Sequence, residues 1–316
     1  MGYERSLMYL ITGVAGFIGS HIAEELIKNE QNQVIGIDNF YSGKQENIDY
    51  LQNIAVNNFT FIKADICDYG QINSIFQEYS IKYIFHQAAI ASVQISIQNP
   101  RLTHKVNIEG TLNILEAARN HNVSKVVFAS SAAVYGDEPT LPKNELSILK
   151  PISPYGYEKM MGEHYLQLYS ELYDLDCVAL RYFNVYGPRQ DPNSEYSGVI
   201  SIFEDKIKRS EPLVIYGDGE QYRDFIYVKD VVIANINAMK NQTNKFDCFC
   251  VGTSKKTTLN ELVQLIKNKY QSSSLTTYEL QRSGDIRASI CDNTKLSNLL
   301  NTSNFSQIHD IFTRDQ

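Results

Sequence analysis

The chain has 316 residues, of which 43% are apolar and 21% charged, and its formal net charge is −7. The length suits about two globular domains of ordinary size, while the negative charge disfavours a nucleic-acid surface. No apolar run approaches the ~18 residues that a membrane-spanning helix needs, and we expect neither a membrane segment nor a signal peptide.

The five cysteines lack the spacing of a metal site or of a disulfide framework. The close pair, Cys248 and Cys250, lies in a strand-like run and has no second pair to complete a zinc site. We therefore expect no metal, reduced cysteines that all fill the core, and a cytoplasmic location.

The first predicted unit is a strand, a glycine-rich turn and a helix. The apolar run over 7–11 predicts a buried parallel strand, and apolar residues every fourth position predict a helix that ends near Lys28. Gly13 suits the tight turn, Gly16 lets the backbone approach a diphosphate, and Gly19 lets the helix pack on the strand. The helix N-terminus then offers its amides to the phosphates.

The second predicted strand supplies a partner for this turn. A glycine triplet alone also fits an ordinary strand-to-helix turn. The strand over 33–37, however, ends in Asp38, nineteen residues after Gly19, where a carboxylate can bind ribose hydroxyls. Because a carboxylate repels a 2′-phosphate, we interpret this unit as a site for NAD rather than NADP.

Strands and helices alternate through the rest of the first half. Strands are predicted over 59–64, 81–85, 125–129 and 176–181, and helices over 69–79, 102–120 and 155–172. This order predicts an α/β fold with a doubly wound, Rossmann-type parallel sheet. Ligands of such sheets bind at the carboxyl ends of the strands, where the sequence places Asp65, His86 and Ser131.

The pattern changes after Asn184. We expect a loop over 186–197, helices over 200–209 and 259–270, a strand over 212–216 and an irregular, polar tail from Ser297. The predicted organisation is a cofactor-binding domain over 1–182, which 225–250 rejoins, and a smaller mixed α/β substrate domain over the remainder of 183–316.

A tyrosine and a lysine four residues apart open the helix predicted from Tyr155. Tyr155 and Lys159 lie on one helix face. The pKa of a tyrosine phenol is ordinarily about 10, and the Lys159 ammonium together with the cationic nicotinamide would favour the phenolate form of Tyr155. Chance also produces such pairs, since the chain has 21 tyrosines. Ser131, at the end of an earlier strand, adds a hydroxyl that can bond a substrate oxygen while its proton moves.

Nine motifs follow one another in order between residues 7 and 292. They are Gly13-x-x-Gly16-x-x-Gly19, Asp65-Ile66, His86-x-Ala88-Ala89, Asn107-x-x-Gly110-Thr111, Ser131-x-x-Val134-Tyr135-Gly136, Tyr155-x-x-x-Lys159, the run 181–188, the runs 217–219 and 223–228, and Arg282-x-Gly284-Asp285. In this order the chain resembles the extended short-chain dehydrogenase/reductases of the nucleotide-sugar epimerase group, most of all the UDP-hexose and UDP-N-acetylglucosamine 4-epimerases.

The resemblance implies NAD as cofactor, a UDP-sugar as substrate, and roles for individual residues. It makes Tyr155 the catalytic base, Lys159 the modulator of its pKa and Ser131 a second proton partner. Tyr155 and Lys159 are also implied to contact the cofactor, together with Gly13, Gly16, Phe17, Ile18, Gly19, Asp38, Asn39, Asp65, Ile66, Ala88, Ala89 and Asn107. Ser131 and Tyr155 are also implied to contact the substrate, together with Ser92, Asn184, Val199, Ile200, Tyr216, Gly217, Arg223, Arg282, Asp285 and Ser289.

The residues after Ser131 narrow the reaction. Relatives that dehydrate a sugar carry Asp-Glu there, and those that decarboxylate UDP-glucuronate carry a Glu two places on, whereas this chain has Ala132 and Ala133. An alanine cannot protonate a leaving hydroxyl, so the resemblance favours epimerisation. In that reaction the C4 hydride passes to NAD⁺ while Tyr155 takes the O4 proton, the 4-keto sugar turns over, and the hydride returns to its other face.

Ser289 and the run 189–200 bear on the choice of sugar. Ser289 matches a pocket position that is Tyr in relatives confined to plain hexoses, and the run resembles epimerases of UDP-N-acetylhexosamines. We therefore favour UDP-GlcNAc and UDP-GalNAc, with UDP-glucose and UDP-galactose as the alternative. A net oxidoreductase and a non-catalytic NAD sensor are lesser alternatives. The resemblance also implies a homodimer formed by the 102–120 and 155–172 helices, and analogy points to polysaccharide biosynthesis.

Overall fold

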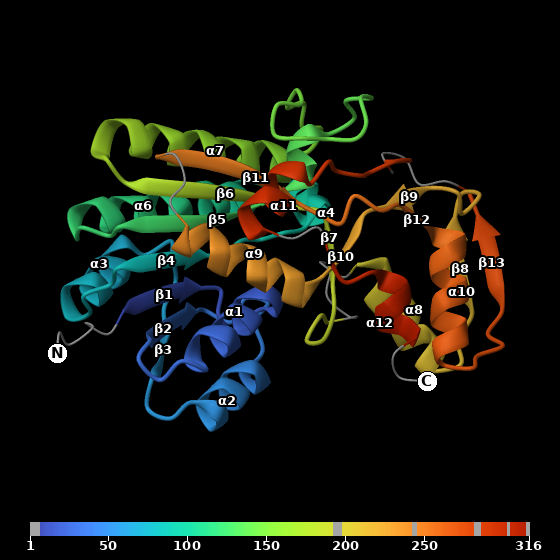
Figure 1. The fold of residues 1–316 in the computed structure, drawn as a ribbon, viewed down its shortest axis with the longest axis horizontal. Helices are drawn as coiled ribbons and strands as arrows, with labels where there is room; N and C mark the ends of the chain where they lie inside the picture. Colours follow the sequence, from blue (N-terminus) through green and yellow to red (C-terminus); the bar gives the residue numbers. More distant parts are fainter. Residues whose placement is uncertain (1–6, 192–197, 242–244, 281–285, 302–303, 314–316) are drawn as a thin grey trace.

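The computed structural model describes residues 7–191, 198–241, 245–280, 286–301 and 304–313 (Figure 1). Its larger half is built on a seven-stranded sheet in the order β11-β6-β5-β4-β1-β2-β3, in which all neighbours are parallel. The strands are β1 (Met8–Thr12), β2 (Gln33–Asp38), β3 (Phe59–Lys63), β4 (Tyr83–His86), β5 (Lys125–Ser131), β6 (Asp176–Tyr182) and β11 (Phe246–Val251). The strand order reverses direction between β1 and β4, which confirms the predicted doubly wound, Rossmann-type sheet.

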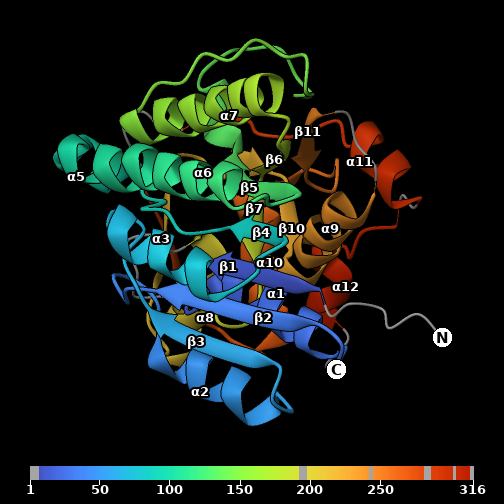
Figure 2. The same cartoon turned by 90° about the vertical axis from the view of Figure 1, so that its left-hand side faces the viewer.

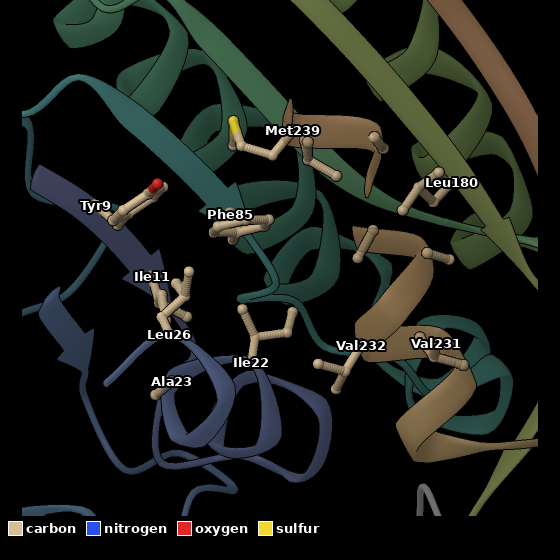
Figure 3. Close-up of a cluster of buried hydrophobic side chains, with 14 of the residues drawn as sticks. Tyr9, Ile11, Ile22, Ala23, Leu26, Phe85, Leu180, Val231, Val232 and Met239 are labelled. Carbon is tan, nitrogen blue, oxygen red and sulfur yellow. The ribbon is translucent and has the colours of Figure 1, made fainter. Parts of the chain in front are cut away.

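Helices cover both faces of this sheet because successive strand residues point to opposite sides. In β1, Ile11 joins a hydrophobic cluster with α1 (Phe17–Ile27), α2 (Gln45–Ile54) and α9 (Val228–Lys240). Figure 3 shows part of this cluster, in which Ile22 and Val232 lie between α1 and α9. Leu10 faces the other way, into a cluster with α3 (Tyr69–Glu78), α6 (Gly110–Asn120) and α7 (Pro154–Tyr173). Figure 2 shows α6 and α7 side by side on that face.

The long helix predicted over 102–120 is interrupted. The chain forms α4 (Val93–Gln98), α5 (Pro100–His104) and a π-helical turn over Lys105–Glu109 before α6 begins. A π turn widens the backbone by one residue and often marks a functional site. Here it turns Asn107 inward, where only 2% of its surface is exposed.

The smaller half, on the right in Figure 1, is assembled from short pieces. Its strands pair as β7 (Asn184–Tyr186) with β10 (Phe225–Tyr227), β8 (Leu213–Tyr216) with β13 (Thr276–Glu279), and β9 (Tyr222–Arg223) with β12 (Thr257–Thr258). Helices α8 (Val199–Lys208), α10 (Leu259–Lys269) and α12 (Ile308–Thr313) enclose a third hydrophobic cluster with Phe203, Ile215 and Leu262.

The prediction of an irregular, polar tail from Ser297 was wrong. The chain forms α11 (Thr294–Leu300) and then α12, and both bury apolar residues. Leu296 and Phe305 pack into the cluster of the large sheet, whereas Phe312 packs into the small half. The polar residues between these anchors conceal the apolar pattern, because each helix has only six or seven residues.

Four chain segments meet at the carboxylate of Asp224, which is completely buried. One carboxylate oxygen accepts hydrogen bonds from the backbone N–H and the hydroxyl of Thr253, both at 2.7 Å. The other oxygen accepts from the N–H of Ser254 at 3.0 Å and of Cys291 at 3.3 Å. The Asp224 carbonyl accepts from the N–H of Asn184 at 3.0 Å. This junction fixes the chain where it passes between the two halves.

Candidate active site

A cavity of about 550 Å³ follows the carboxyl ends of the sheet strands, a volume within the usual range for ligand sites. It reaches from the turn after β1 across to the end of β5 and to the start of the smaller half. Its lining includes fifteen residues that the sequence marked as candidates: Gly13, Gly16, Phe17, Ile18, Gly19, Asp38, Asn39, Asp65, Ile66, Ala88, Ala89, Ser131, Tyr155, Lys159 and Asn184.

The glycine turn after β1 has the geometry that a diphosphate requires. Gly13 has a φ of +71°, and a Cβ there would lie 2.8 Å from the backbone nitrogen of Ala88. A Cβ on Gly19 would overlap the carbonyl oxygen of Gly13. Gly16 is the N-cap of α1 and has no side chain to bond the first-turn amides. These amides and the helix dipole therefore suit the phosphates of a dinucleotide.

Two carboxylates line the cavity beside this turn. At the end of β2, the Asp38 side chain accepts hydrogen bonds from the N–H of Ala15 at 3.0 Å and of Phe40 at 2.8 Å. The amide of Asn39 donates to Asp65 at 3.2 Å, which joins the ends of β2 and β3. A rim of fixed carboxylates accepts ribose hydroxyls and repels a 2′-phosphate, so these residues fit NAD.

Cys67 does not fill the core as expected. Its side chain is half-buried and lines the cavity next to Asp65, whereas the other four cysteines are buried. Burial and the neighbouring Asp65 raise the pKa of the Cys67 thiol to about 12, so it remains a neutral wall residue.

Ser131, Tyr155 and Lys159 meet at the carboxyl end of β5. The Ser131 hydroxyl, which accepts a hydrogen bond from the N–H of Ala133 at 3.1 Å, lies near enough to Tyr155 to lower the pKa of its phenol. Lys159 Nζ donates to the carbonyl of Ala129 at 2.7 Å and lies 5.9 Å from the centre of the Tyr155 ring. The position of Tyr155 and Lys159 on successive turns of α7 thus places a phenol in the cavity with an ammonium behind it.

Burial shifts the pKa values of both Tyr155 and Lys159. It raises the pKa of Tyr155 to about 12, and the neighbouring Ser131 hydroxyl acts in the opposite direction. Burial also lowers the pKa of Lys159 to about 8, against the attraction of Glu158 and Glu163. In the protein alone Tyr155 is therefore neutral at pH 7, and its phenolate requires positive charge brought into the cavity.

His86 fixes the loop that follows β4. Thr12 Oγ1 accepts from the N–H of Ala88 at 3.0 Å and donates to His86 Nδ1 at 2.7 Å, while His86 Nε2 donates to Thr111 Oγ1 at 3.0 Å. This direction follows because Thr111 donates its own proton to the carbonyl of Asn107 at 2.8 Å. Burial lowers the pKa of His86 to about 3, so the imidazole is neutral.

Asn107 and Ser92 lie behind the cavity wall rather than in its lining. The Asn107 amide accepts from the N–H of Ile90 at 2.8 Å and donates to its carbonyl at 3.0 Å. Ser92 caps α4 by accepting from the N–H of Ile95 at 3.1 Å. Both were expected to contact ligands, but their bonds here hold the β4–α4 loop in place.

The predicted sugar-binding residues are spread over the smaller half. Val199 and Ile200 are the first residues of α8. Tyr216 ends β8, and Gly217 forms the following turn with a φ of +91°. Arg223 lies on β9, next to Tyr222, whose carbonyl accepts a hydrogen bond from the N–H of Ser289 at 3.2 Å. None of them lines the 550 Å³ cavity. Arg282 and Asp285 lie outside the described residues.

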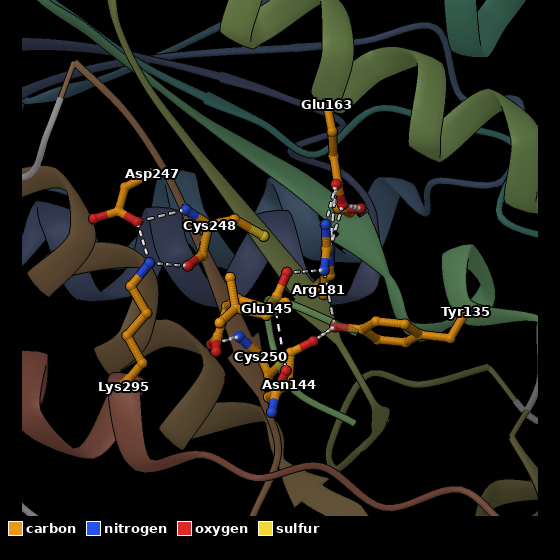
Figure 4. A network of polar contacts seen from close by, with 11 residues as sticks. Tyr135, Asn144, Glu145, Glu163, Arg181, Asp247, Cys248, Cys250 and Lys295 are labelled. Atoms are coloured by element: carbon orange, nitrogen blue, oxygen red, sulfur yellow. Dashed lines mark hydrogen bonds and ion pairs between the residues drawn. The ribbon is translucent and has the colours of Figure 1, made fainter. Parts of the chain in front are cut away.

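Sequence reasoning missed a buried ionic network beside the catalytic group (Figure 4). Glu163 accepts from Ser130 at 2.5 Å and from Arg181 at 2.7 and 2.9 Å. Arg181 also donates to the hydroxyl of Tyr135 at 2.9 Å. The network joins α7 to the ends of β5 and β6. Its one signal in the sequence is spacing, because Glu163 follows Lys159 by one helical turn.

A hydroxyl, a phenol and a lysine at the carboxyl edge of a doubly wound sheet, beside a dinucleotide turn, define an enzyme of the short-chain dehydrogenase/reductase class. Residues 9–252 match the NAD dependent epimerase/dehydratase family, and the chain belongs to this family. NAD is its cofactor.

Similar proteins cover nearly the whole chain. A UDP-glucose 4-epimerase from Thermotoga maritima, solved with UDP-glucose, is 40% identical with a TM-score of 0.90, and the match covers 97% of this chain and 96% of that one. A UDP-N-acetylglucosamine 4-epimerase from Methanobrevibacter ruminantium M1, solved with UDP-N-acetylmuramic acid, is 41% identical with a TM-score of 0.88, over 98% and 95% of the chains. A putative UDP-glucose 4-epimerase from Methanocaldococcus jannaschii is 41% identical over 92% of both chains.

Proposed function

We propose that this enzyme is a UDP-sugar 4-epimerase with tightly bound NAD, and that UDP-GlcNAc and UDP-GalNAc are its preferred substrates. The position of Ser131, Tyr155 and Lys159 together in the lining of one cavity carries the first part of the proposal, with the similarity to 4-epimerases of three UDP-sugars.

The proposed mechanism needs few groups. Bound NAD supplies a hydride acceptor and, in the return step, a hydride donor. Tyr155 removes the proton from the sugar O4 and later restores it, while Ser131 holds that oxygen by a hydrogen bond. Lys159, 5.9 Å from the Tyr155 ring, stabilises the phenolate by its charge.

Ala132 and Ala133 favour epimerisation over elimination. They form the start of a 3₁₀ turn directly after Ser131 and bring no acid to the site. Without an acid to protonate a leaving hydroxyl, elimination is disfavoured, and reduction of the 4-keto sugar by the bound cofactor is favoured.

The preference for N-acetylated sugars is supported by one small side chain. Ser289 is half-buried beside β9 and bonds to Tyr222 through its backbone, and its side chain is much smaller than the tyrosine that relatives confined to plain hexoses carry at the matching position. A difference in pocket volume is typically worth ~1–3 kcal/mol. Interconversion of UDP-glucose and UDP-galactose is the second candidate, because the T. maritima protein was solved with UDP-glucose.

The first experiment is to incubate the purified protein with UDP-GlcNAc without added NAD and to follow the anomeric protons by NMR. We expect UDP-GalNAc to form, and Tyr155→Phe to abolish its formation. If UDP-glucose is converted but UDP-GlcNAc is not, the argument from Ser289 is wrong and the mechanism stands. If neither sugar reacts even with NAD supplied, the 4-epimerase proposal fails. Accumulation of free NADH at 340 nm would instead indicate a net oxidoreductase.

We further propose the domain division 1–182 with 225–250, and the remainder of 183–316. The pairing of β11 with β6 and the packing of α9 against α1 support the return of 225–250 to the large half. Free cysteines throughout support a cytoplasmic location, and a role in polysaccharide biosynthesis is proposed by analogy. Among the described helices, none has the length and apolar character to cross a bilayer.

A homodimer through α6 and α7 is also part of the proposal. The outer surface of α7 exposes Leu172 by 61%, Tyr157 by 52% and Leu168 by 43%, which is costly for a helix that faces only water. Light scattering should give a dimer mass for the wild type and a monomer mass for Leu172→Lys. Leu280→Lys, at a residue 93% exposed in the smaller half, is the matched control and should remain a dimer.

A further inference from the structure

Glu158 is a buried carboxylate that the mechanism above does not use. Only 3% of its surface is exposed, although it stands between Tyr155 and Lys159 in the sequence of α7. One carboxylate oxygen accepts from the hydroxyl of Thr103 at 2.7 Å, and the other accepts from the amide of Asn107 at 2.6 Å. Both partners are neutral. Because burying a charge without a cation partner is costly, this carboxylate calls for a functional reason.

The first consequence of the buried carboxylate is mechanical. The NH₂ group of Asn107 donates both to Glu158 and to the carbonyl of Ile90, so that Glu158 fixes the orientation of the amide. Asn107 in turn holds both backbone groups of Ile90. Ile90 and the preceding Ala88 and Ala89 line the cofactor cavity. The π turn over Lys105–Glu109 brings Asn107 into this position, so that α7 is connected to the loop beside the cofactor.

The second consequence is electrostatic. The charged groups that face Lys159 are Glu158 and Glu163 on its own helix, and both raise the pKa of its ammonium. From β4, His86 faces it as a neutral imidazole, and Tyr155 lies one turn before it. Burial alone would drive Lys159 towards its neutral form, in which it could not stabilise a phenolate.

We propose that Glu158 is a positioning residue for the catalytic group, which keeps Lys159 charged and locks Asn107 against the loop beside the cofactor. This proposal rests on the proposed function and deepens it. Glu158 keeps Lys159 protonated, and the Lys159 ammonium stabilises the Tyr155 phenolate. The charge of Glu158, and not only its hydrogen bonds to Thr103 and Asn107, is therefore part of the proposal.

The test is a titration of Lys159 in the NAD-loaded enzyme, which requires no sugar substrate. Lysine labelled with ¹³C at Cε gives one NMR signal per lysine, and the signal missing in Lys159→Met identifies Lys159. In Glu158→Gln the amide can accept from Asn107 and donate to Thr103, so the hydrogen bonds are retained and only the charge is lost. We expect the pKa of Lys159 to fall by about one unit.

Glu171→Gln is the matched control, because Glu171 is an exposed glutamate on the same helix. It should leave the pKa of Lys159 unchanged. An unchanged pKa in Glu158→Gln would overturn the electrostatic part of the proposal. Failure of the epimerase assay with a lowered pKa would instead count against the proposed function alone.

A second variant, Asn107→Ala, tests whether Asn107 holds the loop beside the cofactor. It provides a test even if Glu158→Gln does not fold. Asn107→Ala removes the link between Glu158 and Ile90 but leaves the Glu158 charge in place. We expect the dissociation constant of NAD, measured by calorimetry on the NAD-free protein, to rise by about tenfold, the effect of ~1.4 kcal/mol. Unchanged NAD affinity would show that Asn107 does not hold the loop for the cofactor.

Discussion

An ion pair beside the catalytic group and an ion pair in the half around β8 and β13 differ in their exposure to water. Next to the catalytic group, Glu163 and Arg181 form an ion pair whose side chains are 3% and 6% exposed. In the smaller half, Asp218 and Arg287 form an ion pair that is 54% and 61% exposed. A buried pair resists rearrangement, whereas an exposed one exchanges readily with water. The comparison indicates that the network beside the catalytic group is held more rigidly than the exposed pair of the half proposed to bind the sugar.

Replacement of a tyrosine in each half tests this comparison with the largest expected effect. Tyr155→Phe removes the proposed base while retaining the ring, so kcat for epimerisation should fall by about 10³-fold. Tyr216→Phe, in the smaller half, should mainly raise KM. Steady-state kinetics with both variants checks this, and the comparison breaks if Tyr216→Phe reduces kcat as strongly.

The two ion pairs give the next largest effect. Glu163→Gln leaves the Arg181 guanidinium buried without its counter-charge and should reduce the free energy of unfolding by about 3–5 kcal/mol. Arg287→Ala should cause no measurable change, since its pair is exposed to water. Denaturant titration of the NAD-loaded protein measures both. Equal losses would show that the exposed pair holds its half together after all.

The close packing of α1 against β1 in the large half can be tested at Gly19. A methyl group at Gly19 overlaps the carbonyl oxygen of Gly13 and pushes α1 away from β1, so Gly19→Ala should cost about 1–3 kcal/mol and weaken NAD binding. Gly70→Ala in α3 meets only the side chain of Asp68 at 3.2 Å and serves as the control. It should be neutral or stabilising, because alanine favours a helix.

Acid should affect the two halves differently, through their histidines. His86 keeps a pKa of about 3 in the native protein, far below its ordinary value of about 6.5. As the pH falls from 6.5 towards 3, the unfolded chain binds a proton that the native state does not, so stability decreases by about 1.4 kcal/mol per pH unit. His86→Gln should lose this dependence. His309→Gln, at a side chain 70% exposed, should keep it. Denaturation midpoints at pH 7 and pH 5 distinguish the outcomes.

The same comparison explains which features the sequence could predict. The elements of the large half could be predicted because apolar runs, glycine spacing and polar strand ends are local patterns. These patterns singled out Gly13, Asp38 and Tyr155, which line one cavity in the structure. The π turn before α6 was hidden within a continuous helical pattern. Glu158 was overlooked because its partners lie 51 and 55 residues away, a distance at which no local pattern indicates a contact.

The tail and the smaller half were less predictable for a related reason. The helices predicted over 200–209 and 259–270 match α8 and α10, but the short strands and tail helices take their places only when distant segments come together, as β13 does with β8. Ser289 takes its place beside Tyr222 through such a long-range pairing.

The junction at Asp224 has a consequence for dissecting the protein. Since α9 and β11 return to the large sheet, the chain crosses between the halves more than once, and the crossings converge on Asp224. A fragment that stops at residue 182 would lack β11 and expose β6 as an edge. Neither half therefore corresponds to a continuous gene segment, and chimeras that exchange sugar preference between relatives would have to transplant several separate stretches at once.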